Sequence, residues 1–169
     1  MKIAILDDYQ NAVSQLKCFD LVKDYDVKIL NRSYTNAADL ASEIKDAQIL
    51  VLIRESTKID DELLSLLPNL KLISQTGKIS NHLDLAACTK HRVAVSEGIG
   101  SPIAPAELTW MLIMNATRKV PQAIEAMKKG EWQTNIGSTI HGKMIGIWGY
   151  GKIGQMIAQY AKAFGAKVQ

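Results

Sequence analysis

Three glycines near the end of the sequence have the spacing of a phosphate-binding turn. They are Gly149, Gly151 and Gly154, with Tyr150, Lys152 and Ile153 between them. The apolar run Met144–Trp148 predicts a buried strand before the turn, and a helical pattern follows it. Glycine at these positions allows a tight turn, close approach of backbone N–H groups to a pyrophosphate, and close packing of the helix on the strand. We therefore expect a dinucleotide at the helix N-terminus, with a ligand-free structural turn as the alternative.

The residues before this turn alternate between short apolar runs and helical patterns. Helices are expected over Asn11–Leu21, after the capping residue Asn36, from Asp60 and after Asp84. Strands are expected at Lys2–Leu6, Asp26–Leu30, Gln48–Ile53, Leu70–Ser74 and Val93–Val95. Strands separated by helices of this length predict a parallel sheet with right-handed crossovers, and five of them suggest a flavodoxin-like α/β domain.

A break in the pattern divides the chain. Gly98–Pro105 holds two glycines and two prolines, and it predicts a boundary between domains at 1–100 and 101–169. Beyond it, Ala106–Lys119 reads as a helix that is apolar nearly all round, and Pro121 begins a second one. A helix of that kind must be covered by another domain or another subunit.

Composition excludes several classes of protein. The chain has 169 residues, 47% hydrophobic and 22% charged, which is typical of a globular protein. A net charge of +3, with no basic cluster interleaved with aromatics, argues against nucleic-acid binding. No targeting or membrane-spanning run is visible, so we expect no membrane partner and a cytoplasmic location. The cysteines and histidines lack metal-ligand spacing, so no metal site is expected.

Several further motifs carry a resemblance. They are Leu52-Ile53-Arg54, Pro68-Asn69-Leu70-Lys71, Thr76-Gly77 with Leu83-Asp84 after it, Pro105-Ala106-Glu107, and Trp148–Gly154. With them the chain resembles the D-isomer-specific 2-hydroxyacid dehydrogenase family, particularly members similar to D-3-phosphoglycerate dehydrogenase. Ile79 and Asn81 depart from the family pattern, which usually has a glycine and an acid there. The resemblance implies a flavodoxin-like substrate domain followed by the first βαβ part of a truncated Rossmann domain.

The resemblance also implies an activity, which is hydride transfer between NAD and a small 2-hydroxy or 2-keto acid. NADP is not excluded, because the residue that reads the ribose 2′-hydroxyl is expected beyond Gln169. The implied cofactor site is Gly149–Gly154, and the implied dimer contact is Ala106–Lys119. The implied substrate-binding residues are Arg54, Gln75, Thr76, Gly77 and Lys78. For Arg54 the alternative is that it ends a strand and meets a neighbouring acid such as Glu55.

The catalytic arginine and the histidine–acid pair of the family are expected downstream of Gln169. We therefore expect this chain to be an N-terminal part without catalytic residues of its own, and inactive alone. Two further interpretations remain open. One is a module that binds a dinucleotide or an organic acid without turnover, and the other is a truncated product without function.

Overall fold

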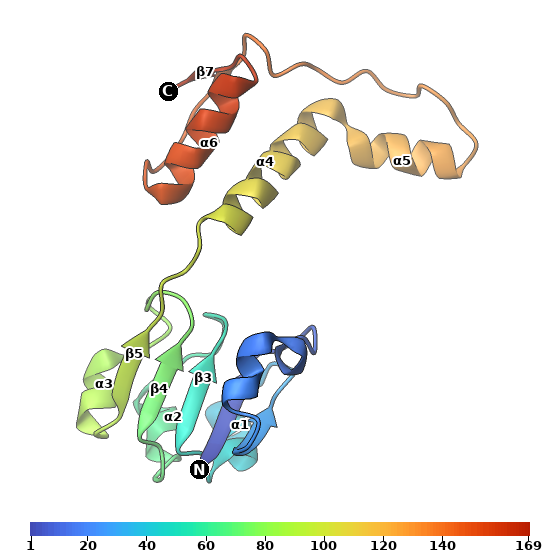
Figure 1. Cartoon of the computed structure of the whole chain (residues 1–169). Coiled ribbons are helices and arrows are strands. Elements are labelled where there is room, and N and C mark those ends of the chain that lie inside the picture. Colours follow the sequence, from blue (N-terminus) through green and yellow to red (C-terminus); the bar gives the residue numbers. More distant parts are fainter. The chain divides into compact units, whose positions relative to one another are not determined.

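The computed structural model describes residues 1–169 as two compact units, Met1–Gly100 and Ser101–Gln169. The first unit is a five-stranded parallel sheet in the order β2-β1-β3-β4-β5, with three helices (Figure 1). Its strands are β1 Lys2–Leu6, β2 Asp26–Ile29, β3 Ile49–Leu52, β4 Leu72–Gln75 and β5 Ala94–Glu97, and its helices are α1 Ala37–Ile44, α2 Asp61–Ser65 and α3 Leu85–Lys90. This order confirms the predicted flavodoxin-like fold.

Both faces of the sheet are covered, which explains why its strands are apolar without strict alternation. Along β1, Ala4 and Leu6 belong to the larger core cluster, together with side chains from α1, α2 and α3. Ile3 and Ile5 belong to a smaller cluster on the other face, with Val13. Successive residues of a strand point to opposite faces, so this one apolar run serves both clusters.

Each of the three helices of the first unit is capped at its N-terminus by the side chain of a predicted residue. The side chain of Asn36 accepts the backbone N–H of Asp39 at 2.8 Å. Asp60 and Asp84 act in the same way at α2 and α3. Each cap pairs a donor that the first turn leaves without an intrahelical acceptor.

The predicted helix over Asn11–Leu21 was wrong. The segment forms two short 3₁₀ helices, Val13–Gln15 and Lys17–Leu21, separated by Leu16 in an extended conformation. Asn11 has a φ of 51°, which a continuous α-helix cannot accommodate. The carboxylate of Asp8 accepts the N–H groups of Ala12 and Val13, and these bonds bend the chain at this point.

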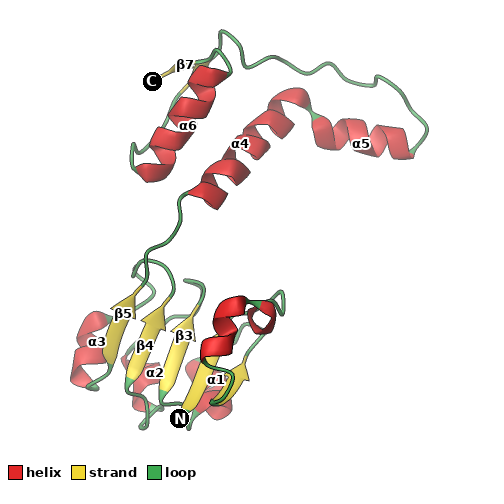
Figure 2. Ribbon diagram, viewed as in Figure 1, coloured by secondary structure: helices red, strands yellow, loops and turns green.

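The second unit contains three helices and two short parallel strands (Figure 2). They are α4 Ile103–Arg118, α5 Val120–Lys128, β6 Met144–Ile145, α6 Lys152–Ala163 and β7 Lys167–Val168. Helix α4 packs against α6, and the centres of the Trp110 and Phe164 rings lie 4.9 Å apart. Lys119 has a φ of 54°, and this left-handed residue separates α4 from α5. The unit β6–α6–β7 confirms the predicted strand–turn–helix context of the glycines.

Two predictions for this unit need correction. The strand expected over Met144–Trp148 has only two residues, because β7 offers two partners, although the N–H of Ile147 adds one more bond to Gln169. Trp148 is fully exposed rather than buried. Helix α4 begins at Ile103, three residues before the predicted start at Ala106, because Pro105 lies in the first turn, where proline removes no hydrogen bond.

Candidate functional site

The parallel strands of the first unit end at one edge of the sheet, where the sequence places several polar residues (Figure 1). Arg54 follows β3 by two residues, Gln75 ends β4, and Glu97 ends β5. Ligands of open parallel α/β sheets bind outside this carboxyl edge. The fold therefore brings the predicted substrate-binding residues onto neighbouring strands of one edge.

Arg54 is a half-buried cation without an acidic partner. Its Nε donates to the carbonyl oxygen of Asp7 at 3.0 Å, and its Nη2 donates to the side-chain oxygen of Gln10. The alternative of a pair with Glu55 was wrong, because no carboxylate lies within 4.0 Å of Arg54 and Glu55 accepts instead from the Ser80 hydroxyl. A guanidinium held by neutral acceptors keeps its charge available for an anion.

The loop after β4 contributes backbone donors unequally. The N–H of Thr76 donates to the carbonyl of Leu52 at 3.0 Å and continues the sheet ladder, so it is not available to a ligand. Gln75 is buried, and its side-chain oxygen lies 3.1 Å from Nε2 of His82. The N–H groups of Gly77 and Lys78 have no acceptor within the protein. These two donors are the ones that this loop can offer to an anion.

The same loop already binds a carboxylate of its own chain. Glu97 pairs with the ammonium of Lys78 and accepts the N–H of Ile79 at 3.2 Å. The hydrogen bond from Lys78, followed by that from Ile79, lowers the pKa of Glu97 below its usual range. Ile79 has no positive φ, so a side chain in place of the family glycine causes no backbone strain. Lys78 and Ile79 thus both contact a carboxylate of the chain itself.

The glycine turn of the second unit has the features that a pyrophosphate requires. Gly149 has a φ of 94°, and Gly151 lies at the N-cap of α6 without any side-chain cap. A Cβ placed at Gly151 would meet nothing within 4 Å, whereas one at Gly154 would lie 2.3 Å from the carbonyl oxygen of Gly149. Gly151 therefore leaves open space beside the helix end, and Gly154 allows the turn to pack closely against the helix.

Free donors and a favourable charge complete this turn. No acidic residue stands in the first turn of α6, and Gln155 is the first residue whose N–H returns to the turn, at the carbonyl of Gly151. The three intervening residues Tyr150, Lys152 and Ile153 are exposed. Unpaired N–H groups and the positive end of the helix dipole suit an anion. The residues present therefore fit the diphosphate of a dinucleotide.

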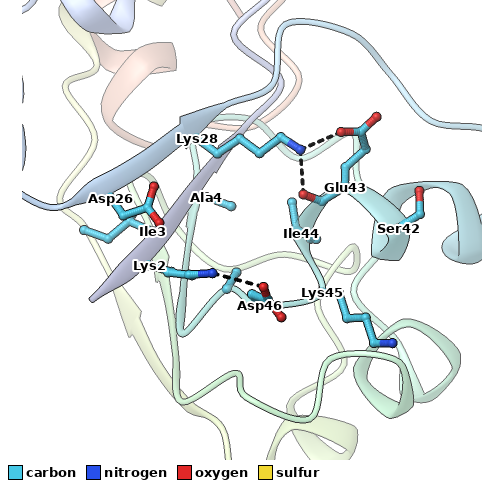
Figure 3. A pocket seen from close by; sticks show the side chains of 11 residues that line it. Lys2, Ile3, Ala4, Asp26, Lys28, Ser42, Glu43, Ile44, Lys45 and Asp46 are labelled. Atoms are coloured by element: carbon cyan, nitrogen blue, oxygen red, sulfur yellow. Dashed lines mark hydrogen bonds and ion pairs between the residues drawn. The ribbon is translucent and has the colours of Figure 1, made fainter.

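A hollow at the opposite edge of the first unit is a different environment. It has a volume of about 350 Å³ and lies where β1 and β2 begin, beside the end of α1 (Figure 3). Lys28 donates to the carboxylate and the carbonyl of Glu43, and Lys2 pairs with Asp46 (Figure 3). These two lysines are thus neutralised within the protein, whereas Asp26 and Lys45, which also line the hollow, form no ion pair and carry opposite charges.

Sequence reasoning missed several side chains at the carboxyl edge. Asp7, Tyr9 and Gln10 surround Arg54, and Glu97 occupies the loop after β4. The available signal was position, since Asp7 directly follows the predicted strand Lys2–Leu6 and Glu97 comes two residues after the predicted strand Val93–Val95. No group of three histidine, cysteine, aspartate or glutamate residues is arranged to hold a metal ion. None of the helices combines the length and the apolar character that crossing a membrane requires.

Several known proteins are similar to this chain in sequence and in fold. The family model for the catalytic domain of D-isomer-specific 2-hydroxyacid dehydrogenases matches residues 3–163. D-3-phosphoglycerate dehydrogenase of Methanocaldococcus jannaschii is 37% identical over 133 residues, which cover 77% of this chain and 25% of that protein.

Solved structures extend the match over nearly the whole chain. Phosphoglycerate oxidoreductase from Vibrio cholerae O395 is 51% identical with a TM-score of 0.95, over 99% of this chain and 55% of that one. D-Lactate dehydrogenase from Aquifex aeolicus, complexed with NAD and lactic acid, is 27% identical with a TM-score of 0.74, over 98% of this chain and 50% of that one. The chain thus spans about half the length of these solved relatives. It belongs to the D-isomer-specific 2-hydroxyacid dehydrogenase family.

Proposed function

We propose that this chain is the substrate-binding and the first cofactor-binding part of a cytoplasmic NAD-dependent oxidoreductase acting on small 2-hydroxy or 2-keto acids. The observation that carries the proposal is the glycine turn, where Gly151 leaves open space at the uncapped N-terminus of α6. NADP remains an alternative cofactor. Two free cysteines, Cys18 and Cys88, agree with a reducing compartment.

The two units supply different donors. In the second unit, N–H groups at the start of α6 hold the diphosphate, next to Gly151 and Gly154. In the first unit, the N–H groups of Gly77 and Lys78 bind the substrate carboxylate, and Arg54 pairs with an anionic group of the substrate. When bound, the nicotinamide supplies or accepts the hydride at C2 of the acid.

We further propose that residues 1–169 alone do not catalyse turnover. Each histidine has another role, since His82 bonds to Gln75, His91 pairs with Asp61, and the His141 ring lies against Gly165. Only His91 pairs with an acid, and it follows α3, so no histidine–acid pair stands among the residues at the carboxyl edge to act as the general acid, which contributes about 10²–10⁴ in rate. A module that binds both ligands without turnover is the second candidate, favoured by the free donors at both sites.

Binding of NADH to purified chain tests the cofactor part. The Gly151→Val variant places a side chain in the open space at the helix end, so binding should be lost while the fold is kept. Gly100→Val is the matched control, because a Cβ there also meets nothing within 4 Å and lies outside the turn. Equal NADH affinity in wild type and Gly151→Val would show that the glycines form only a structural turn.

An assay of NADH oxidation with glyoxylate, pyruvate and hydroxypyruvate tests the expected inactivity. We expect no steady oxidation by the 169-residue chain, even at concentrations where NADH binds. Steady oxidation that is abolished in Arg54→Ala would contradict this and would reveal a proton donor within these residues.

A further inference from the structure

Three residues just after β1 hold the side chain of Arg54. The Asp7 carbonyl accepts from Nε of Arg54, the Gln10 side chain accepts from Nη2, and the Tyr9 ring lies 5.2 Å from the guanidinium carbon. An aromatic face at this distance attracts a cation and matches the planar guanidinium. Arg54 is therefore contacted along one edge and one face by a single short segment.

The side chain of Tyr9 is itself held by hydrogen bonds of its hydroxyl group. Its hydroxyl lies 3.0 Å from a carboxylate oxygen of Asp7 and 3.3 Å from the hydroxyl of Ser56. The other carboxylate oxygen of Asp7 accepts from the hydroxyl of Thr57 at 2.9 Å. Both oxygens of this buried carboxylate thus bond to hydroxyl groups, and neither pairs with Arg54.

The backbone of Asp7 supports the same arrangement. Asp7 has a φ of 65°, an unusual value for a buried residue with a side chain. Its carbonyl accepts both the N–H of Tyr9 at 2.9 Å and Nε of Arg54 at 3.0 Å. Strained backbone of this kind persists where surrounding contacts enforce it, and it is concentrated at functional sites.

A second arginine in the same unit shows what is special here. Arg32 also lies over a tyrosine, at 4.9 Å from the centre of the Tyr34 ring, but its Nη2 pairs with Glu43. Arg54 has the aromatic face without the acidic partner. Its two protein acceptors use only two of its five N–H donors, so the others remain for a ligand.

We propose that Tyr9 is a positioning residue, whose ring face orients the free donors of Arg54 toward an anionic group of the substrate. The inference rests on the proposed function, which makes Arg54 a substrate-binding residue. Tyr9 acts through Arg54, and its replacement should therefore affect binding only while Arg54 is present.

Titration calorimetry with 3-phosphoglycerate, which carries two anionic groups, tests this dependence. Tyr9→Leu should weaken binding about two- to fivefold, the range expected for loss of a cation–aromatic contact. Tyr9→Phe keeps the ring and should restore affinity to within about twofold. The double variant Tyr9→Leu with Arg54→Ala should bind no more weakly than Arg54→Ala alone. Tyr34→Leu is the matched control and should bind like wild type.

A nuclear magnetic resonance readout separates this inference from the proposed function. The Nε–H signal of Arg54, assigned by its loss in Arg54→Ala, should be sharp in wild type and in Tyr9→Phe, and broadened in Tyr9→Leu. Wild-type chain that fails to bind 3-phosphoglycerate would refute the substrate role, while a broadened signal in Tyr9→Leu would still support positioning. Any of three results would overturn the positioning role of Tyr9. They are an unchanged signal and affinity in Tyr9→Leu, additive losses of affinity in the double variant, and a Tyr9→Phe variant that binds as weakly as Tyr9→Leu.

Discussion

Two charged side chains at the carboxyl edge of the first unit are held in opposite ways. Arg54 contacts neutral acceptors and keeps its charge unpaired, whereas Glu97 pairs with Lys78 and with the N–H of Ile79. The unpaired guanidinium of Arg54 can therefore bind an anion, whereas Lys78 and Ile79 already bind the carboxylate of Glu97. A substrate carboxylate that binds at residues 77–79 therefore competes with Glu97 for the same positive environment.

Replacing Glu97 by glutamine should strengthen the binding of carboxylates to this loop. The variant removes the negative charge, while the pKa of Glu97, lowered by Lys78, keeps the wild-type carboxylate charged at neutral pH. Because the Glu97–Lys78 pair is exposed, its free energy is that of a surface ion pair, and we expect glyoxylate affinity to increase about a few-fold. Chemical-shift titration with glyoxylate measures it, and Glu62→Gln, an exposed acid on α2, is the control. Weaker binding in Glu97→Gln would instead make Glu97 a support for the loop.

At the scale of elements, an ion cluster joins α2 to α3. Asp61 pairs with Lys90 at 2.8 Å and with His91 at 2.7 Å, and the hydrogen bond from Lys90, followed by that from His91, lowers the pKa of Asp61. A lowered folded-state pKa adds stability above the unfolded-state pKa of about 3.9, and this contribution is lost as the pH falls through the folded-state value.

Asp61→Asn should therefore be less stable than wild type at pH 7, and the difference should decrease as the pH falls below about 4. Urea unfolding followed by circular dichroism at both pH values measures it. Asp24→Asn is the control, since Asp24 is exposed and has no ion pair. A stability difference that is the same at both pH values would show that Asp61 contributes through packing rather than charge.

The end of β5 packs closely on the loop after β4. A Cβ at Gly98 would lie 2.2 Å from the carbonyl oxygen of Thr76, and the N–H of Gly98 donates to the carbonyl of Gly77. Gly98→Ala must displace backbone, and we expect a loss of unfolding free energy of about 1–3 kcal/mol. Gly77→Ala is the comparison, because its Cβ would meet only a side-chain nitrogen at 3.9 Å. Equal stability of the two variants in urea would contradict the close packing.

Elements specified by local chemistry could be predicted from the sequence, and contacts between distant segments could not. The cap at Asn36 and the apolar run of β1 depend on neighbouring residues, and both were predicted. The segment Asn11–Leu21 is an exception, because the carboxylate of Asp8, only four and five residues away, competes with the helix for the N–H groups of Ala12 and Val13. The partners of Arg54 were missed because Asp7 is 47 positions away in the sequence.

At the scale of the whole molecule, we expect a homodimer formed through Ala106–Lys119. Leu108, Met111 and Leu112 are about half exposed on α4, while Trp110 packs on Phe164 and Tyr160 of its own unit. The exposed side chains, rather than Trp110, are thus available to a second copy across a two-fold axis.

Leu112→Glu should therefore raise the dissociation constant of the dimer by at least about thirtyfold, the effect of losing roughly 2 kcal/mol at an interface anchor. Sedimentation equilibrium measures it. Leu85→Glu introduces the same charge at an exposed leucine of the first unit and should leave assembly unchanged. A wild-type chain that remains monomeric at tens of micromolar would refute the interface.

The placement of the aromatic residues gives each unit its own optical signal. All three tryptophans, Trp110, Trp132 and Trp148, belong to the second unit, and only Trp110 is shielded by neighbouring rings. Indole emission on selective excitation therefore reports the second unit alone, and its blue-shifted part reports the packing of α4 on α6. Far-ultraviolet circular dichroism includes the five-stranded sheet as well. Unfolding of the two units can thus be followed separately in one sample without any added label.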